Sequence, residues 1–500
     1  MDIDSRLYRA DQVRELDRRA IAGNAEDRGI AGFELMQRAG AAVFRAVRAR
    51  FPEAKSLVAC CGGGNNGGDG YVVASLARRA GLQVRVIAMK APAELDGDAR
   101  RAADAWLDAG GPVSEPDGQI EADVIVDALL GTGLDREVRD DYAALIESMN
   151  ASDAAVVAVD VPSGLQADTG MPLGTAVRAD ATVSFIGRKR GLETGRAPDF
   201  TGAVLFDDLD VPDSAYRDLD PDAVRLSDTA VQEFLPPRMR AVHKGALGHP
   251  LVCGGDFNMP GAVLLAARAA LVTGSGLVSV ATRREHSMAL AGSLPEAMWA
   301  DGESGDTLDA LAARTDVIAL GPGLGTSDWS REAWRRLLGR DLPVVLDADG
   351  LNLLAEHGFD RENWILTPHP GEAGRLLEVS TADVQRDRFA AARELAERFR
   401  AVVVLKGAGS LVADPDGRVA LCPFGNPAMA TAGMGDALTG IIASLVGQGG
   451  RREGMLFDAA CAGVVVHARA GDVAAEGRRA ILAGELIAAV PRVLPGTPRP

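Results

Sequence analysis

The chain has 500 residues, of which 47% are hydrophobic and 25% charged, and its formal net charge is −17. This length is too great for one hydrophobic core and predicts two or three domains. The acidic balance argues against binding of nucleic acid or of an anionic membrane, although it leaves room for a local basic pocket that holds phosphate.

The cysteines and the apolar segments indicate the compartment. Five cysteines, at positions 60, 61, 253, 422 and 461, are odd in number and lack metal-ligand spacing, which predicts reduced thiols and no zinc site. The N-terminal segment carries charges where an export signal needs an apolar run, and the apolar segment 261–281 contains Arg268. We therefore expect a cytoplasmic protein without a transmembrane span.

The first half begins with a helical pattern over residues 11–50 and a short apolar segment, 56–60, that predicts a strand. The stretch CGGGNNGGDG (61–70) follows, and a helix is predicted after it. Strand, glycine-rich loop and helix in this order can hold a pyrophosphate at the helix N-terminus. The alternative is a turn that is stabilised by Asn and Asp side chains.

Two more predicted strands, 123–128 and 154–159, end in polar loops. Ligands of an open parallel sheet bind beyond the carboxyl ends of its strands, so these loops are candidate ligand loops. Asn66, Asp127 and Ser163 can together supply the oxygen ligands of a hard cation, although each alone is a common hydrogen-bonding residue of loops.

Residues 207–226, rich in Asp and Pro and without apolar periodicity, are typical of a linker. We predict domains at 1–212 and 226–500 and a linker at 213–225. The second half again alternates predicted strands and helices, and its predicted strands are 250–253, 316–320, 343–346, 364–366 and 401–405. Each leads into glycine, an acid or a lone cation, which predicts the rim of one nucleotide-sized crevice.

Three residues on this rim allow two interpretations each. Lys406 is either a positive charge for phosphate, with 407–410 as its backbone cradle, or an exposed lysine at a strand end. His369 is either a rigid loop residue or a ligand contact. Glu372 either binds metal-bridged phosphate or caps the next helix.

The segment TAGMGD (431–436) closes this crevice, and a helix follows it. The apolar residues of that helix fall at i, i+3, i+4, i+7 and i+8, and they are Leu438, Ile441, Ile442, Leu445 and Val446. The helix N-terminus can hold an anion, and Asp436 there can accept a proton. The alternative is that Asp436 is only the helix N-cap.

The motifs of both halves resemble those of known families. The second half resembles the NAD(P)H-hydrate dehydratases of the ribokinase-like superfamily in the segments 243–245, 261–282, GPGLG (321–325), DADGLN (347–352), TPHPGE (367–372), KGAGS (406–410) and TAGMGDALTG (431–440). The first half resembles the NAD(P)H-hydrate epimerase domain in the segments 61–74, DALLGTGLDREV (127–138), 156–170 and 188–202. This order of domains is similar to that of the bifunctional nicotinamide-nucleotide repair enzymes. The resemblance implies two three-layer α/β domains, the first Rossmann-like and the second ribokinase-like.

The resemblance implies that the second half dehydrates the S form of hydrated NADH or NADPH, with ADP as the phosphate donor, magnesium as cofactor, and AMP and phosphate as products. Asp436 would be the base toward the C6 hydroxyl. The residues implied to contact the hydrated dinucleotide are Ala262, Gly323, His369 and Asp436. The residues implied to hold the nucleotide phosphates are Lys406, Gly407, Ala408, Gly409, Ser410 and Gly435.

For the first half, the resemblance implies exchange of the R and S epimers at C6, with Asp160 as the proton-transfer group. The residues implied to hold the dinucleotide are Asn65, Asn66, Gly67, Gly68, Asp69, Gly131, Thr132, Gly133, Leu134, Asp135, Arg136, Glu137 and Asp160. Potassium would be bound by Asn66, Asp127 and Ser163. The family also implies a homo-oligomer.

Two alternatives remain open from the sequence. The second half is compatible with an ATP-dependent kinase of a vitamin precursor that uses the same Asp436 and the same anion site. The first half is compatible with a non-catalytic module that binds a dinucleotide or RNA, although the acidic charge disfavours RNA.

Overall fold

The structure is a computed structural model that describes residues 3–23, 27–116, 118, 120–450 and 452–496. The chain divides into two compact units, Met1–Val224 and Arg225–Pro500. Both units are α/β, as predicted.

The segment 213–225, predicted as a linker, is folded largely with the first unit. It contains α7 (Asp213–Tyr216) and β10 (Ala223–Arg225), and β10 pairs antiparallel with β1 (Arg6–Tyr8). Tyr216 is buried, and its hydroxyl donates to a backbone carbonyl oxygen at 2.9 Å. The segment is therefore folded structure with a buried aromatic side chain and is not an extended linker.

The first unit is built on a sheet of parallel strands in the order β4-β3-β2-β5-β6-β7-β9. The chain runs outward from β2 to β4, returns to β5 and continues to β9, so the strand order reverses between β2 and β5. The strands are β2 (Ser56–Cys61), β3 (Gln83–Ala88), β4 (Val113–Ser114), β5 (Val124–Ala128), β6 (Ala155–Val159), β7 (Ala181–Phe185) and β9 (Ala203–Asp207).

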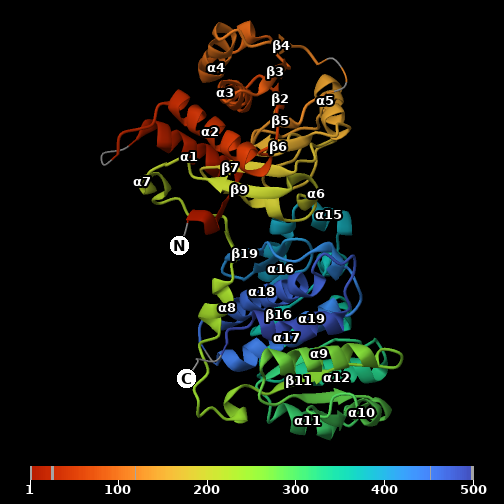
Figure 1. The fold of residues 1–500 in the computed structure, drawn as a ribbon. Helices are drawn as coiled ribbons and strands as arrows, with labels where there is room; N and C mark the ends of the chain where they lie inside the picture. Colours follow the sequence, from red (N-terminus) through yellow and green to blue (C-terminus); the bar gives the residue numbers. More distant parts are fainter. Residues whose placement is uncertain (1–2, 24–26, 117, 119, 451, 497–500) are drawn as a thin grey trace. The chain divides into compact units, whose positions relative to one another are not determined.

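Helices cover both faces of this sheet (Figure 1). Along β2, Leu57 and Ala59 pack with the helices of one face, whereas Val58 and Cys60 pack with the other, as the alternation of side chains along a strand requires. The first face is covered by α1 (Ala10–Ala22), α2 (Gly32–Arg50), α3 (Asn65–Arg79) and α4 (Gly97–Asp108), and the second by α5 (Asp140–Asn150). Further short elements are β8 (Arg188–Lys189) and α6 (Pro198–Thr201).

The second unit has a sheet in the order β13-β12-β11-β14-β15-β16-β17-β18-β19, parallel from β13 to β17 and antiparallel beyond. Its strand order reverses between β11 and β14. The strands are β11 (Pro250–Cys253), β12 (Ser279–Thr282), β13 (Met298–Asp301), β14 (Val317–Leu320), β15 (Val344–Leu346), β16 (Trp364–Leu366), β17 (Val402–Leu405), β18 (Ser410–Ala413) and β19 (Val419–Cys422). The five strands predicted in this half are therefore confirmed to within one residue at each end.

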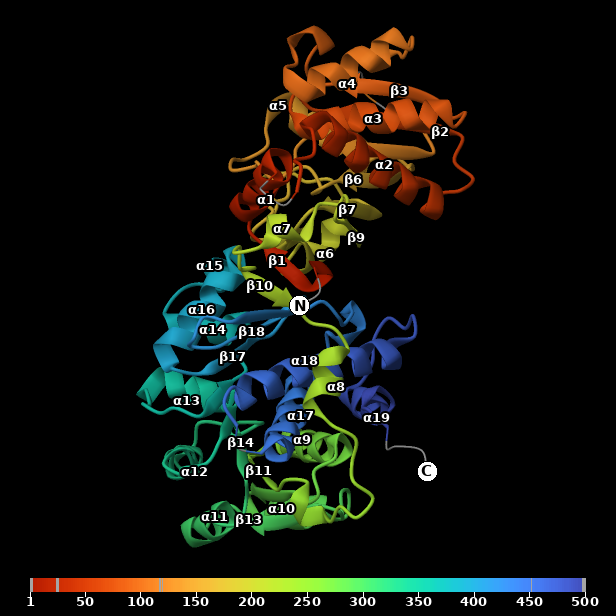
Figure 2. The same cartoon turned by 90° about the vertical axis from the view of Figure 1, so that its left-hand side faces the viewer.

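Figure 2 shows helices on both sides of this second sheet. One side carries α8 (Thr229–Phe234), α9 (Pro260–Thr273), α17 (Met434–Gly449), α18 (Met455–Ala475) and α19 (Ala483–Val493). The remaining helices are α10 (Arg284–Ala291), α11 (Gly305–Ala312), α12 (Asp328–Leu338), α13 (Asp349–His357), α14 (Pro370–Leu377), α15 (Thr381–Arg386) and α16 (Arg388–Phe399).

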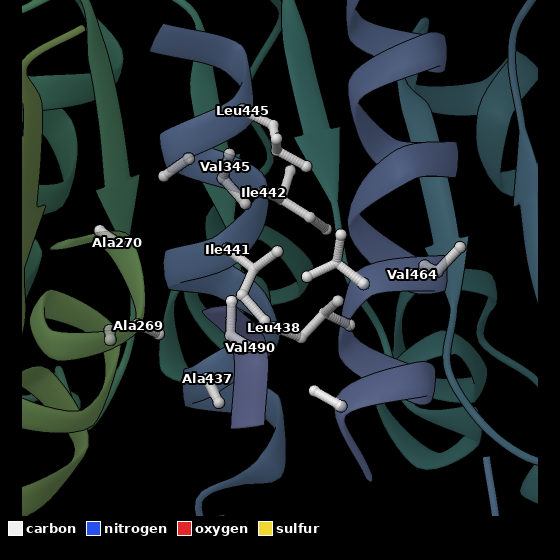
Figure 3. Packing of buried hydrophobic residues seen from close by; sticks show 14 of the residues in the cluster. Ala269, Ala270, Val345, Ala437, Leu438, Ile441, Ile442, Leu445, Val464 and Val490 are labelled. Atoms are coloured by element: carbon white, nitrogen blue, oxygen red, sulfur yellow. The ribbon is translucent and has the colours of Figure 1, made fainter. Parts of the chain in front are cut away.

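The helix α17 lies at the centre of the second core. Figure 3 shows Ile441 and Leu438 of this helix among side chains of α9, α18 and α19. Every residue from Ala437 to Val446 is buried, so the helix is enclosed on all sides, whereas the periodic pattern predicted one buried face. Its N-terminus is consequently held rigidly at the carboxyl edge of the sheet.

None of the helices in the described part of the chain is long and apolar enough to cross a membrane. The cysteines at 60, 61, 253, 422 and 461 are all buried and free of disulfides.

Candidate active sites

The first unit has a pocket of about 690 Å³ beyond the carboxyl ends of β2, β5 and β6. It lies where the strand order reverses, because the loops that follow β2 and β5 turn away from each other there and leave a crevice. The predicted residues that line it are Asn65, Asn66, Asp69, Gly131, Thr132, Gly133, Leu134, Asp135, Arg136 and Asp160. A volume of this size is typical of a small-molecule site.

Three of the predicted dinucleotide residues lie outside this lining. Glu137 is exposed and pairs with Arg139 at 2.6 Å. Gly67 and Gly68 are buried in α3, which begins at Asn65 and not after the glycine-rich stretch as predicted. A Cβ at Gly67 would lie 2.1 Å from the Gly62 carbonyl oxygen, and one at Gly68 would lie 2.5 Å from Met36 Cε. These glycines therefore allow α3 to pack closely, and Asn65 and Asn66 at the start of the helix line the pocket.

Asp160 is held in an unusual backbone conformation, with φ of 67°. This left-handed region is costly for a residue with a side chain and persists where the surroundings enforce it. The Asp160 carboxylate forms an ion pair with Lys189, whose side chain is 1% exposed. The Lys189 ammonium also donates to the Phe185 carbonyl oxygen at 3.0 Å and contacts Ser184 Oγ at 3.2 Å. A buried lysine thus fixes the acid that the sequence indicated as the proton-transfer group.

Asp127 and Ser163, two of the predicted cation ligands, are in direct contact. The Ser163 hydroxyl donates to Asp127 Oδ1 at 2.6 Å, and the Ser163 N–H donates to Asp127 Oδ2 at 2.7 Å. Burial raises the pKa of Asp127 to about 6, although these hydrogen bonds lower the pKa. Asn66, the third ligand, lies against Gly131, and its amide nitrogen is buried without a hydrogen-bond partner among the described residues.

In the second unit, Lys406 and Asp347 form a buried ion pair. Lys406 Nζ lies 2.6 Å from Asp347 Oδ1 and 3.8 Å from Glu372 Oε2. The Thr439 hydroxyl donates to the other Asp347 oxygen at 2.8 Å. Burial alone would raise the pKa of Asp347, but Lys406 and the hydrogen bonds hold it below its usual range. The interpretation of Lys406 as an exposed strand-end lysine is therefore wrong.

Asp436 is the third residue of α17 and not its N-cap, which is Gly433 in the left-handed conformation with φ of 88°. Burial, with the nearby negative charge of Asp347, raises the pKa of Asp436 to about 6, although Lys406 lowers it. The helix N-terminus and Lys406 favour the anionic form while burial opposes it. The result is a carboxyl group that changes protonation close to neutral pH, as a general base requires.

The segment Lys406–Ser410 forms a tight turn between β17 and β18 in which Gly407 has φ of 146° and Gly409 has φ of 60°. Ser410 Oγ donates to the Gly407 carbonyl oxygen at 3.0 Å and closes the turn. Gly435 lies beside it, since a Cβ at Gly435 would be 3.3 Å from Lys406 Nζ. The turn and the N-terminus of α17 are thus brought together, as the sequence predicted.

Gly323 and Ala262 are adjacent at the place where the second sheet reverses. A Cβ at Gly323 would lie 3.0 Å from Ala262 Cβ, and the Asp256 N–H donates to the Gly323 carbonyl oxygen at 2.6 Å. His369 and Glu372 form a capping box at α14. His369 Nδ1 accepts from the Gly371 and Glu372 N–H groups, and Glu372 Oε2 accepts from the His369 N–H at 2.7 Å. The capping interpretation of Glu372 is confirmed, and the same carboxyl group also faces Lys406.

Comparison with known proteins assigns both units. Residues 250–492 match the model of the NAD(P)H-hydrate dehydratase family, and residues 32–191 match that of the YjeF-related protein N-terminus. The bifunctional NAD(P)H-hydrate repair enzyme of Coxiella burnetii is 48% identical over 96% of this chain and 97% of its own length. The enzyme of the same name from Escherichia coli is 41% identical over 99% of this chain and 95% of its own. A ribokinase-like superfamily structure from Enterococcus faecalis covers 54% of this chain and 94% of its own, with TM-score 0.50 and 26% identity. The chain belongs to the bifunctional NAD(P)H-hydrate repair enzymes.

The repair enzyme contains site residues that the sequence did not single out. Lys189, Asp347 and Thr439 each lie next to a predicted residue and make their contacts across long sequence separations. Asp347 follows directly after β15, and this position at a strand end was the one feature of the sequence that indicated a site residue there. Lys189 carried no signal beyond its motif, because a lysine is expected on the surface. The family assignment favours repair over the metabolite-kinase alternative.

Proposed function

We propose that the second unit dehydrates S-NAD(P)H hydrate with ADP as phosphate donor and that the first unit exchanges the R and S epimers. The observation that carries the dehydratase assignment is the position of Asp436, a half-buried acid in the first turn of α17 beside Lys406. Asp436 would remove the proton of the C6 hydroxyl as this oxygen attacks the terminal phosphorus of ADP. The ring nitrogen would then expel phosphate from C6, and loss of a proton from C5 would restore the dihydropyridine, with AMP as the other product.

The N–H groups at Gly435 and the turn 407–410 would bind the phosphates, together with Lys406. Ala262, Gly323 and His369 would contact the hydrated dinucleotide. Among the described residues no group of three or more Asp, Glu, His or Cys side chains has the geometry of a metal site. Magnesium would enter with the ADP phosphates, a common arrangement for this ion, and would neutralise charge during transfer.

Potassium fits the donor set of the first unit. Asp127, Ser163 and Asn66 supply oxygen donors with one formal charge, and the Asn66 amide has an unsatisfied buried atom. An amide can present either its oxygen or its nitrogen by rotation, so Asn66 can turn an oxygen to the cation. Bound there, potassium would organise the loops after β5 and β6, while Asp160 and Lys189 handle the proton. A cytoplasmic homo-oligomer remains our expectation.

Recovery of reduced-nicotinamide absorbance from a mixture of R and S NADH hydrate tests both assignments. We expect complete recovery with wild-type enzyme and ADP, and none without nucleotide; a parallel ATP reaction measures donor preference. Asp436→Asn should abolish recovery, and Asp160→Asn should stop it after the S fraction. A folded wild-type enzyme that recovers nothing with either nucleotide would refute the proposal.

A further inference from the structure

One face of α1 lines the pocket of the first unit. Val13, Asp17 and Ile21 follow one another at intervals of four residues, so they form a stripe along the helix, and all three line the pocket. Val13 is buried, and Ile21 is 47% exposed although it is a large apolar residue. The stripe is apolar except for Asp17, which places a carboxyl group between two apolar side chains.

The Asp17 side chain makes no hydrogen bond or ion pair within the part of the chain that the structure describes. A half-buried carboxyl group without a partner destabilises a fold. Arg9 and Asp11 near the start of the same helix show the usual arrangement, since they pair at 3.1 Å. The packing of α1 therefore does not explain an acid at position 17. We relate the Asp17 carboxyl group to the pocket that it lines.

Asp17 shares the pocket with the acid–base groups of the first unit. It interacts electrostatically with Lys189 and Asp160, and Asp69 interacts with it in turn. Burial raises the pKa of Asp17 to about 6, and Asp160 adds to this while Lys189 opposes it. Burial also raises the pKa of Asp69. The other charged side chains that line the pocket are Arg14, Asp98, Asp135 and Arg136.

One lysine thus faces three carboxyl groups. Lys189 forms an ion pair with Asp160, whereas Asp17 has no such partner among the described residues. Two acids in one pocket, one paired with a cation and one without a partner, can divide the roles of proton acceptor and proton donor. Asp160 can accept a proton while Asp17 donates one.

We propose that Asp17 is a second proton-transfer group of the epimerase site and works together with Asp160. The proposal rests on the epimerase function proposed above and extends it to a residue of α1. The substrate carbon C6 carries both a hydroxyl group and the ring nitrogen N1, so it can lose its configuration by opening the ring, without expelling hydroxide.

The proton and electron transfers of this step balance. Asp160 takes the proton of the C6 hydroxyl, the oxygen electron pair forms C=O, and the C6–N1 bond breaks. Its electron pair moves to N1, which takes the proton of the Asp17 carboxyl group. Rotation of the resulting aldehyde about C5–C6 presents its other face. N1 then attacks that face, returns its proton to Asp17, and the oxygen recovers its proton from Asp160.

Asp17→Asn in the full-length enzyme tests the proposal, with R-NADH hydrate as substrate. We expect kcat of epimerisation to fall about 100-fold or more, which is the usual contribution of one acid–base group, while KM changes less than threefold. The wild-type rate should fall as the pH rises above about 6, where Asp17 loses its proton, and this fall should be absent from the residual activity of the variant. Asp17→Glu should recover part of the rate.

Asp11→Asn is the matched control, since it makes the same change on α1 at a residue that does not line the pocket. The ADP-dependent dehydration of purified S hydrate by the same samples reports on the other unit, and thermal unfolding reports on the fold. An Asp17→Asn variant with normal unfolding that epimerises within threefold of wild type would overturn the inference. A wild-type enzyme that does not epimerise would instead refute the proposed function of the first unit.

Discussion

Asp347 Oδ1 lies 2.6 Å from Lys406 Nζ, and the two side chains are 2% and 18% exposed. The only strong positive charge beside Gly435 among the described residues is therefore already paired before a nucleotide binds. Glu372 and Asp436 also face the ammonium, so three acids surround one cation. The contact with Asp347, the closest of the three, fixes the direction of Lys406.

Asp347→Asn should weaken nucleotide binding more than it weakens the fold. Lys406 would lose its closest anion and turn toward Glu372 and Asp436, so we expect the KM for ADP to rise about 10-fold, equivalent to ~1.4 kcal/mol. The measurement is the initial rate of dehydration against ADP concentration. Asp414→Asn is the matched control, since Asp414 is as buried and pairs with Arg418 at 2.6 Å. An equal rise of KM in both variants would show that the effect is structural.

The dehydratase should lose activity in mild acid. Burial and the charge of Asp347 raise the pKa of Asp436 to about 6. A base acts only when it is deprotonated, so kcat/KM for S hydrate should be constant above this pH and fall about 10-fold per pH unit below it. The profile of kcat/KM from pH 5 to 8, corrected for enzyme inactivation, provides the check.

In Asp347→Asn this acid limb should move to lower pH. The substitution removes a negative charge that raises the pKa of Asp436, and it frees Lys406 to lower that pKa further. An unchanged limb would assign the titration to a group other than Asp436.

The strands that the sequence predicted were placed well because most of them are short apolar runs that lead into glycine, an acid or a lone cation. β11 and β16 were predicted with their observed ends, since strands buried on both faces have few alternatives. The start of α3 was placed too late, because glycine is expected in loops, and tight packing against Met36 selects glycine here inside a helix.

The side-chain pairs of the sites could not be predicted in the same way. Lys189 meets Asp160 because Asp160 directly follows β6, and the segment after the neighbouring β7 brings Lys189 to the same end of the sheet. Lys406 meets Asp347 across three strands. Such contacts depend on strand order and register. These are tertiary properties that periodicity and local motifs do not contain.

Arg388→Met should disturb the turn 406–410, which we propose binds the nucleotide phosphates. The buried Arg388 guanidinium donates to the Leu405 carbonyl oxygen at 3.1 Å, to the Lys406 carbonyl oxygen at 3.3 Å and to Gln385 Oε1 at 2.9 Å. A Cβ at Gly407 would lie 2.9 Å from it, so guanidinium and turn are in contact. We expect Arg388→Met to raise the KM for ADP at least 10-fold and to lower the melting temperature, because each buried acceptor left unpaired costs about 1–3 kcal/mol.

Arg388→Lys separates shape from charge in the same assay. A lysine keeps the positive charge but cannot reproduce the planar fork that reaches several acceptors. It should therefore recover less than half of the lost affinity for ADP. Full recovery by lysine would mean that the charge, and not the hydrogen bonds to the turn, is what Arg388 supplies.

Gly70→Ala should destabilise the first unit although alanine is the better helix former. A Cβ at Gly70 would lie 2.6 Å from Ala128 Cβ and 2.7 Å from Cys61 Sγ, at the contact of α3 with β2 and β5. Both neighbours are short side chains in a parallel sheet and cannot move aside. We therefore expect the free energy of unfolding to fall by about 1–3 kcal/mol, the usual cost of overpacking.

Gly133→Ala is the matched control, because a Cβ there has no atom within 4 Å. Chemical unfolding followed by far-UV circular dichroism measures both, and a Gly70→Ala variant as stable as wild type would mean that α3 can shift away from the sheet.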